Sequence, residues 1–249
     1  MRAPRIVLRT FGPDPAQEWL RLVRVLELTI RTHCPTWTID RQAVSVPDGL
    51  SSPLGVQNAV DNFVKLAAWN EAVQAADQGD RLLLLDADTM ILQPLESIWD
   101  DPALDVAITT KPADARFPIN AGVVAVRVST ATQAFFDLWQ SEDRRLFLDP
   151  REHQVWRGNF GGLNQSSLGA LLTRGGLGVR IVKLPCREWN AEDHSWASLT
   201  PSTRIVHLKG ELRAALFEHG HKSEEMRPII RQWRVLEAAA MRGHVAGHV

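Results

Sequence analysis

The chain has no tyrosine and only two cysteines, Cys34 and Cys186, among its 249 residues. So few cysteines argue against a disulfide framework and predict two free thiols in a reducing compartment. Charge of one sign is not in excess either, because 28 Lys and Arg residues face 29 Asp and Glu residues. The formal net charge of -1 therefore predicts no bulk basic field for nucleic acid or for an anionic membrane.

Long apolar runs are also missing. No stretch approaches the ~20 apolar residues of a membrane span, and the N-terminal segment MRAPRIVLRTF enters a strand-like run without the apolar stretch of a signal peptide. We therefore expect a cytoplasmic protein, free in solution or peripheral to a membrane. The 45% of hydrophobic residues is enough for a sizeable core.

Strand and helix patterns alternate in the first half of the chain. Strand patterns cover residues 6–10, 37–46 and 81–85, and helical patterns cover residues 17–32 and 56–76. A loop rich in Pro and Gly covers residues 47–55. Such alternation predicts a largely parallel sheet with helices on both faces and a ligand crevice beyond the carboxyl ends of the strands.

The second half is less regular, which predicts a mixed sheet. Strand patterns cover residues 105–109, 122–128, 179–183 and 204–207, and helical patterns cover residues 130–140, 165–172 and 224–242. The sequence shows no internal repeat and no linker. We therefore expect an α/β fold with a mixed central sheet flanked by helices, as a single domain over residues 1–249 with a helical C-terminal tail.

The segment LLLLDADTMIL contains the strongest chemical signal. Its four leucines predict a fully buried strand that ends in Asp86 and Asp88. Two carboxylates one residue apart at a strand end can hold one hard divalent cation together with a diphosphate. A purely structural use, in which Asp88 starts a turn and Asp86 caps a backbone donor, is the usual meaning of a bare Asp-x-Asp. The preceding leucine run favours the metal.

Two other enzyme classes could use the same aspartate pair. Phosphatases of the haloacid dehalogenase type also place two aspartates after an apolar strand, but they expect Thr or Val where this chain has Met90. They also need a downstream acidic pair, which the sequence does not offer. A nucleotidyltransferase would carry a Gly-rich basic loop near the N-terminus, and LRTFGPDPAQ is not one. Both classes remain as alternatives.

Four further segments follow the aspartate pair in order: FPINAGVVAVR (117–127), LNQSSLGALL (163–172), LPCREWN (184–190) and VHLKGELR (206–213). Together with LLLLDADTMIL they resemble glycosyltransferase family 8, the glycogenin-like enzymes of the GT-A fold. The resemblance extends over residues 6–213. It implies transfer of a hexosyl group from a UDP-sugar to a hydroxyl acceptor, with retention of anomeric configuration.

The resemblance also implies a metal site. Asp86, Asp88 and His207 would hold Mn²⁺ (or Mg²⁺), with Ala87 in the same donor-binding segment. Carboxylate oxygens with one imidazole suit manganese better than calcium, because imidazole favours transition metals. Without the resemblance, the simpler interpretation of His207 is a structural histidine at a strand end, with its ring nitrogens hydrogen-bonded within the fold.

Further donor contacts follow from the resemblance. Gly210 would let the backbone approach a phosphate, and Arg213 stands where the family usually has a lysine that pairs with the diphosphate. The Pro-Trp that commonly follows in the family is replaced by Ala214 and Ala215. Lys65 matches a position of the family that contacts the nucleotide-sugar donor. An exposed lysine on a helix, without a role in binding, is an equally good interpretation.

Two further segments would supply the remaining donor contacts. Thr10 and Phe11 end the first strand and are expected under the nucleotide base. Asn120 and Ala121 would face the donor sugar or the ribose.

The segment that departs most from the family is Asn164-Gln165-Ser166, where the family commonly has Asp-Gln-Asp. Asn164 can hydrogen-bond a sugar but cannot act as a base, and it is also a good helix N-cap. Gln165 keeps the family identity and is expected beneath the anomeric carbon. Retention would then use a same-face route in which the departing phosphate takes the acceptor proton. An inverting route would need Glu192 or Asp193 as the base.

The acceptor is not fixed by the sequence. Trp156, Trp189 and Trp196 lie in loop-rich stretches and could stack on an acceptor sugar, although core packing is the more common use of tryptophan. The acceptor could be a glycan, a lipid, a protein, a small molecule or a modified nucleobase.

Overall fold

The computed structural model describes residues 2–11, 17–51, 53, 57–112, 115, 117–192, 196, 199–217 and 223–245. Contacts group the chain into two compact units, each built from separate stretches of sequence. Unit 1 comprises Met1–Gly12, Thr38–Leu85 and Asp101–Leu184, and unit 2 comprises Pro13–Trp37, Asp86–Asp100 and Pro185–Val249. We describe each unit by itself.

Unit 1 is built on a six-stranded mixed sheet with the strand order β2-β1-β3-β6-β5-β7. The strands are β1 (Arg5–Phe11), β2 (Thr38–Val44), β3 (Arg81–Leu85), β5 (Val106–Thr110), β6 (Ile119–Arg127) and β7 (Ile181–Pro185). β1 pairs in parallel with β2 and β3, whereas β6 is antiparallel to β3 and β5. β3 lies between β1 and β6, and its four leucines are at most 1% exposed.

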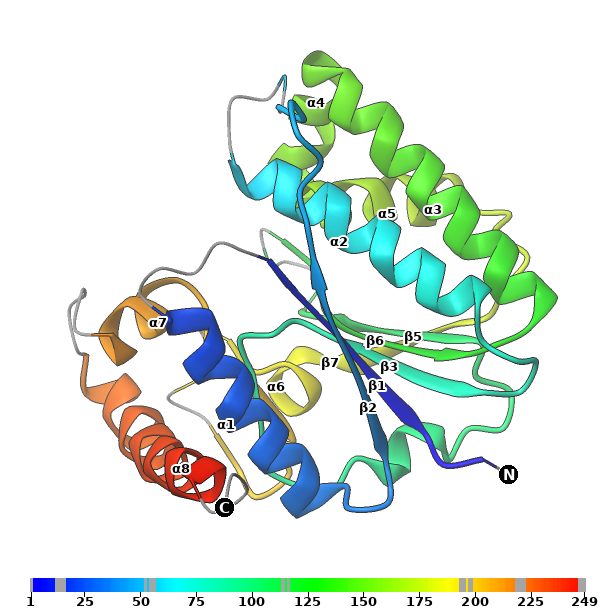
Figure 1. Ribbon diagram of the computed structural model, residues 1–249. Helices are drawn as coiled ribbons and strands as arrows, with labels where there is room; N and C mark the ends of the chain where they lie inside the picture. The colour runs from blue at the N-terminus through cyan, green and yellow to red at the C-terminus, as the bar shows by residue number, and fades with distance from the viewer. Residues whose placement is uncertain are drawn as a thin grey trace. The chain divides into compact units, whose positions relative to one another are not determined.

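Three helices of unit 1 pack on one face of this sheet (Figure 1). They are α2 (Gln57–Gln74), α3 (Thr130–Leu148) and α5 (Leu163–Arg174), and α4 (Pro150–Phe160) joins the last two. Leu66, Trp69 and Val73 recur at helical spacing on α2 and enter the core beside Trp139 of α3. A capping box of Ser129 and Thr132 starts α3. These helices and the sheet therefore share one apolar core.

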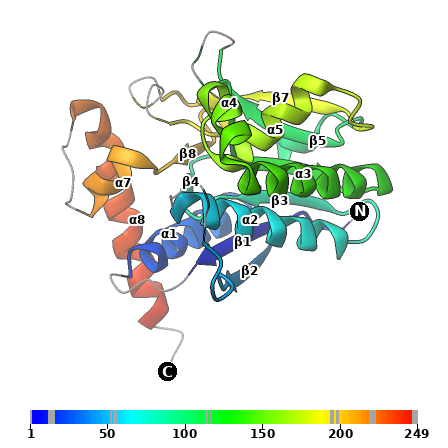
Figure 2. The same cartoon turned by 90° about the horizontal axis from the view of Figure 1, so that it is seen from above.

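Unit 2 contains a two-stranded antiparallel ladder of β4 (Thr89–Ile91) and β8 (Ile205–His207), seen side by side in Figure 2. Its helices are α1 (Glu18–His33), α6 (Cys186–Trp189), α7 (Gly210–Leu216) and α8 (Arg227–Val245), with the short 3-10 helices η1 (Glu96–Trp99) and η3 (Glu224–Met226). α1 and α8 lie along one another and share a core with α7 through Leu22, Trp233 and Leu212.

The predicted α/β class, with a mixed central sheet and flanking helices, is confirmed. β3 has the predicted bounds, whereas β6 begins three residues earlier than the predicted strand at 122–128, so that Asn120 and Ala121 lie on the strand. The sequence patterns missed β4 and α4, because a three-residue strand and a polar helix carry too little apolar periodicity. The single-domain organisation stays a prediction.

In the part of the chain that the structure describes, no helix has the length and apolar character that a membrane span requires. The cytoplasmic location stays a prediction. Both cysteines are buried free thiols, as expected.

Candidate active site

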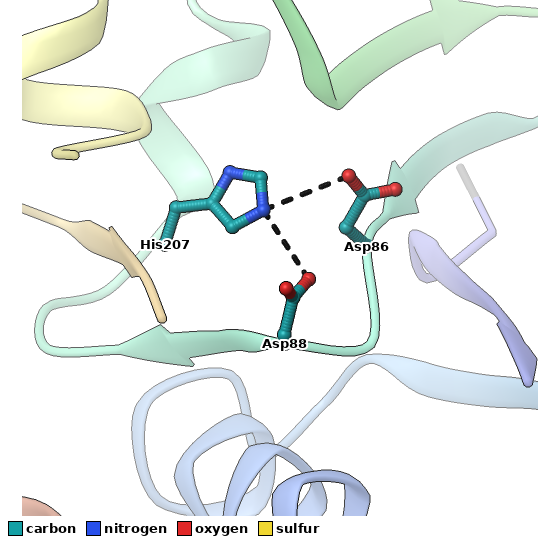
Figure 3. Close-up of side chains that lie close together, drawn as sticks. All are labelled: Asp86, Asp88 and His207. Atoms are coloured by element: carbon teal, nitrogen blue, oxygen red, sulfur yellow. Dashed lines mark ion pairs between the residues drawn. The ribbon is translucent and has the colours of Figure 1, made fainter. Parts of the chain in front are cut away.

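The β4–β8 ladder brings the two halves of the predicted metal site together. Thr89 of β4 pairs directly with His207 of β8, and the Leu208 N–H donates to the Asp88 carbonyl oxygen at 2.7 Å. The Thr89 hydroxyl donates to the Asp86 carbonyl oxygen at 2.8 Å, which fixes the turn between the two acids. The side chains of Asp86, Asp88 and His207 consequently converge (Figure 3).

The three side chains have the spacing of a metal site. His207 Nε2 lies 3.2 Å from Asp88 Oδ1 and 3.7 Å from Asp86 Oδ2, and one ligand atom from each residue lies within 4.8 Å of the others. Two neighbouring ligands of an octahedral ion, each about 2.1 Å from it, are about 3.0 Å apart. The donor set of two carboxylates and an imidazole therefore fits a divalent cation with little movement.

A neighbouring amide orients the imidazole. His207 Nδ1 lies 3.1 Å from Asn190 Oδ1, an acceptor that keeps the proton on Nδ1 in the neutral ring. The Nε2 lone pair then faces two carboxylates. This arrangement is repulsive unless a proton or a metal cation lies between them, so the hydrogen bond itself favours a metal at this position.

Arg213 neutralises the other side of Asp88. Its Nη1 lies 3.0 Å from Asp88 Oδ2, which leaves Oδ1 for a metal, and its guanidinium lies 4.9 Å from the centre of the Trp19 ring. Burial raises the pKa of Asp88, but the charge and hydrogen bond that His207 offers when its ring is protonated, together with the charge of Arg213, outweigh burial and bring this pKa below its ordinary value. Asp88 is therefore ionised at neutral pH, as a metal ligand must be.

Gly210 begins α7 with a left-handed φ of 57°, and no heavy atom lies within 4 Å of the position that a Cβ would occupy. Glycine adopts this backbone conformation without strain. The predicted approach of this backbone to a phosphate is therefore sterically open.

Solved structures share this architecture at low sequence identity. A glycosyltransferase involved in the glycosylation of the major capsid of PBCV-1 aligns with a TM-score of 0.61 and 16% identity, covering 87% of this chain and 98% of that chain. The galactosyltransferase LgtC, in complex with donor and acceptor sugar analogs, aligns with a TM-score of 0.59 and 12% identity, covering 94% and 95%. The chain has the GT-A glycosyltransferase fold.

A third similar structure is the glycosyltransferase GlyE of Streptococcus pneumoniae TIGR4, with a TM-score of 0.50, 13% identity and coverage of 98% of this chain and 64% of that chain. No family model matches the sequence, and a comparison with curated proteins finds no match. The structural similarity shows the GT-A fold but not the chemistry, which depends on individual residues.

The residues predicted to face the sugar lie in unit 1. Gln165 Nε2 donates to the carbonyl oxygens of Ile119 and Phe160, at 2.7 and 2.8 Å. Both N–H hydrogens are thus used, and Oε1 has no hydrogen-bond partner among the residues that the structure describes. The amide is locked with only its acceptor oxygen available, which is the group that can stabilise positive charge on an anomeric carbon.

Asn164 is buried at 2% exposure and connects three helices. Its Nδ2 donates to the Asn62 carbonyl oxygen of α2 at 2.9 Å and to Asp143 Oδ1 of α3 at 3.2 Å. The N-cap of α5 is Gly162, so the expectation that Asn164 caps the helix is wrong. The predicted contact of Asn164 with sugar hydroxyls stays a prediction, and these hydrogen bonds give it a positioning role.

Asp143 is a buried acid that the sequence analysis missed. Ser167 Oγ donates to its Oδ1 at 2.6 Å, whereas Oδ2 has no partner among the described residues. Burial raises the pKa of Asp143 to about 7, although hydrogen bonds from Ser167 and Asn164 and the charge of Lys65 oppose the rise. The sequence did contain a sign that Asp143 is buried. The residue lies four positions from both Trp139 and Phe147, on the apolar side of α3, where an acid is unexpected.

The other predicted donor contacts lie on unit 1 as follows. Lys65 is half-buried on α2 with its Nζ 4.7 Å from the centre of the Trp69 ring. Thr10 and Phe11 end β1 and are half-buried, so both can be reached. Asn120 is buried and its Oδ1 accepts from the Gly122 N–H at 2.8 Å, while Ala121 packs in the core. Contact of these residues with a donor stays a prediction.

Several alternatives from the sequence are weakened. Glu192 is 2% exposed and forms an ion pair with Lys209, so it is a poor general base, and Asp193 lies outside the described residues.

Trp189 and Trp196 are about equally buried, at 6% and 5% exposure, which contradicts stacking on an acceptor. Trp156 is half-buried and stacks on Phe160 instead.

Proposed function

We propose that this protein is a metal-dependent glycosyltransferase that transfers a hexosyl group from a UDP-sugar to a hydroxyl acceptor. The proposal is supported above all by the convergence of Asp86, Asp88 and His207, with Asn190 orienting the imidazole, on a GT-A fold. The resemblance to glycosyltransferase family 8 supports the UDP-sugar donor and a retaining outcome.

Each residue of the metal group has a defined task. Asp86, Asp88 and His207 Nε2 would hold a divalent cation, Mn²⁺ or Mg²⁺, and a bound cation would supply positive charge opposite the leaving diphosphate. Arg213 is held near Asp88 by a charge-assisted hydrogen bond and by the Trp19 ring. Its guanidinium can turn from Asp88 to the diphosphate, where its planar donors match phosphate oxygens.

The transfer breaks the bond between the anomeric carbon and the diphosphate oxygen and forms a bond from that carbon to the acceptor oxygen. The acceptor proton passes to the departing diphosphate, so no protein base is needed. Gln165 presents its fixed Oε1 to the positive charge that develops on the sugar. With Glu192 paired to Lys209, this same-face route with retention is favoured over inversion.

Binding of UDP-glucose and UDP-galactose tests the donor assignment through the thermal melting temperature, with and without Mn²⁺. Either donor is expected to raise the Tm only when Mn²⁺ is present, and D88N is expected to remove that increase. D100N is the matched control, because Asp100 is an exposed acid of the same unit whose carboxylate has no partner among the described residues. If no UDP-sugar binds with Mn²⁺, or if D88N retains the full effect, the proposed function is wrong.

Product analysis separates the remaining classes. Release of free sugar without any acceptor product would indicate a hydrolase, and transfer of the nucleotide would indicate a nucleotidyltransferase. NMR of the glycosidic product gives its configuration, and an inverted anomer would exclude the same-face route.

A further inference from the structure

Unit 1 contains a cavity of about 640 Å³ that the donor assignment does not use. Its walls come from the first turns of α2, from α4 and from the Gly161–Gly162 segment before α5. Asn58 and Asn62 line it from α2, four residues apart, and therefore face the same way. The cavity is large enough for a sugar unit.

The chemistry of the walls suits a carbohydrate. The amides of Asn58, Asn62 and Gln154 can each donate to and accept from hydroxyl groups, and the Phe117 ring offers a flat apolar surface. Sugars present this combination, because their rings carry hydroxyls around the rim and C–H groups on the faces.

One wall of the cavity carries a positive charge that no residue described by the structure pairs with. Arg157 lines the cavity, and its side chain makes no ion pair or hydrogen bond within the described ranges. Glu142 of α3 and Glu152 of α4 are paired with Arg145 and Arg174. Among the residues that the structure describes, none that lines the cavity is acidic. This wall therefore favours a ligand with negative charge.

His153 adds an unsatisfied polar group to the same wall. The side chain lies one helical turn before Arg157, is 4% exposed, and its Nε2 has no hydrogen-bond partner among the described residues. Burial, and then the charge of Arg157, lower the pKa of His153, so the ring is neutral at neutral pH. A buried polar atom without a partner at a cavity wall indicates that the set of contacts is incomplete.

Gly161 connects the cavity to Gln165. Its φ is 89°, and a Cβ at this position would lie 3.5 Å from both Gln165 Nε2 and the Phe117 ring. The absence of a side chain thus keeps the cavity open beside the amide that is expected at the anomeric carbon. A hydroxyl of a molecule in the cavity would lie near the predicted point of transfer.

We propose that this cavity binds the acceptor and that the acceptor is a sugar carrying an anionic group, which Arg157 recognises. The assignment as an acceptor rests on the proposed glycosyl transfer, whereas binding of the charged sugar does not. The shared chemistry is an oxyanion on a hexose, supplied either by a phosphate ester or by a carboxylate.

Ligand-observed NMR titration of the full chain, without metal or nucleotide sugar, tests the binding. The probes are glucose 6-phosphate, glucuronic acid, glucose and inorganic phosphate. At least one charged sugar is expected to bind about tenfold more tightly than glucose and than phosphate, because a charged hydrogen bond adds to the sugar contacts. R157Q is expected to reduce that affinity about tenfold, to the level of glucose. R151Q is the matched control, since Arg151 is an exposed arginine of the same helix that does not line the cavity.

The outcomes are distinct. A gain for glucose 6-phosphate alone identifies a phosphate, and a gain for glucuronic acid alone identifies a carboxylate. Equal binding of glucose, equal binding of free phosphate, or an unchanged preference in R157Q would overturn the proposed ligand class. D88N is expected to bind the charged sugar as tightly as the wild type does. A failure of the proposed donor site can therefore be told apart from a failure of the proposed acceptor cavity. If the enzyme transfers to another acceptor but leaves the bound charged sugar unmodified, the acceptor role is wrong.

Discussion

Replacing Asp143 with Asn is expected to make the protein more stable at alkaline pH. The carboxyl group is fully buried, and its Oδ2 has no partner among the described residues. Burial raises its pKa from the ordinary value of 3.8 to about 7, so ionisation opposes folding at neutral and alkaline pH. Asparagine has nearly the same shape and stays neutral, so it mimics the protonated acid at every pH.

The sign and size follow from proton linkage. Because the folded-state pKa lies above the unfolded one, the stability gained from protonation is complete below about pH 4 and is lost as the pH rises to about 7. A pKa rise of about 3 corresponds to about 4 kcal/mol at about 1.4 kcal/mol per pH unit. Between pH 5 and pH 8.5, D143N should therefore gain about 3 kcal/mol relative to the wild type.

Urea unfolding at several pH values measures this difference. E142Q provides a control of opposite sign. Burial raises the pKa of Glu142, but Arg145 and Arg174 outweigh burial and bring it below its ordinary value. Removing this carboxylate should lower the free energy of unfolding at neutral pH. This loss should disappear as the pH falls through the pKa of Glu142 in the folded protein. If the stability difference between D143N and the wild type is the same at pH 5 and pH 8.5, the buried acid titrates normally and the reasoning is wrong.

Two further substitutions test the metal centre and the core. N190A removes the acceptor of the His207 Nδ1 proton. The affinity for Mn²⁺, measured by calorimetry, should fall about 10–100-fold while the protein remains folded. An unchanged affinity would mean that Asn190 does not orient the ring. W69A empties a fully buried position between α2 and the sheet and should lower the free energy of unfolding by about 3–5 kcal/mol. A loss below about 1 kcal/mol in denaturant titration would show that the surrounding core collapses into the space.

The sequence by itself determined the fold class and the strongest part of the site. Leu82 to Leu85 predicted a buried strand, because a run of four leucines before two aspartates has no polar face to expose. Asp86 and Asp88 at its end predicted two metal ligands, whereas His207 was expected as the third only through the resemblance to glycosyltransferase family 8; the three side chains converge in the structure. Local periodicity predicts the strand and the position of the two aspartates at its end, because it depends only on residues that are neighbours along the chain.

Tertiary structure alone decided how these residues are held and what surrounds the sugar-facing segment. The pairing of β4 with β8, which joins Asp88 to His207, depends on two three-residue strands more than 100 residues apart and leaves no periodic trace. The burial of Asp143 and the grouping of Arg157 with Asn62 likewise depend on which helix faces pack together. Such contacts between distant segments are set by packing rather than by local sequence, and they decide the electrostatics of this site.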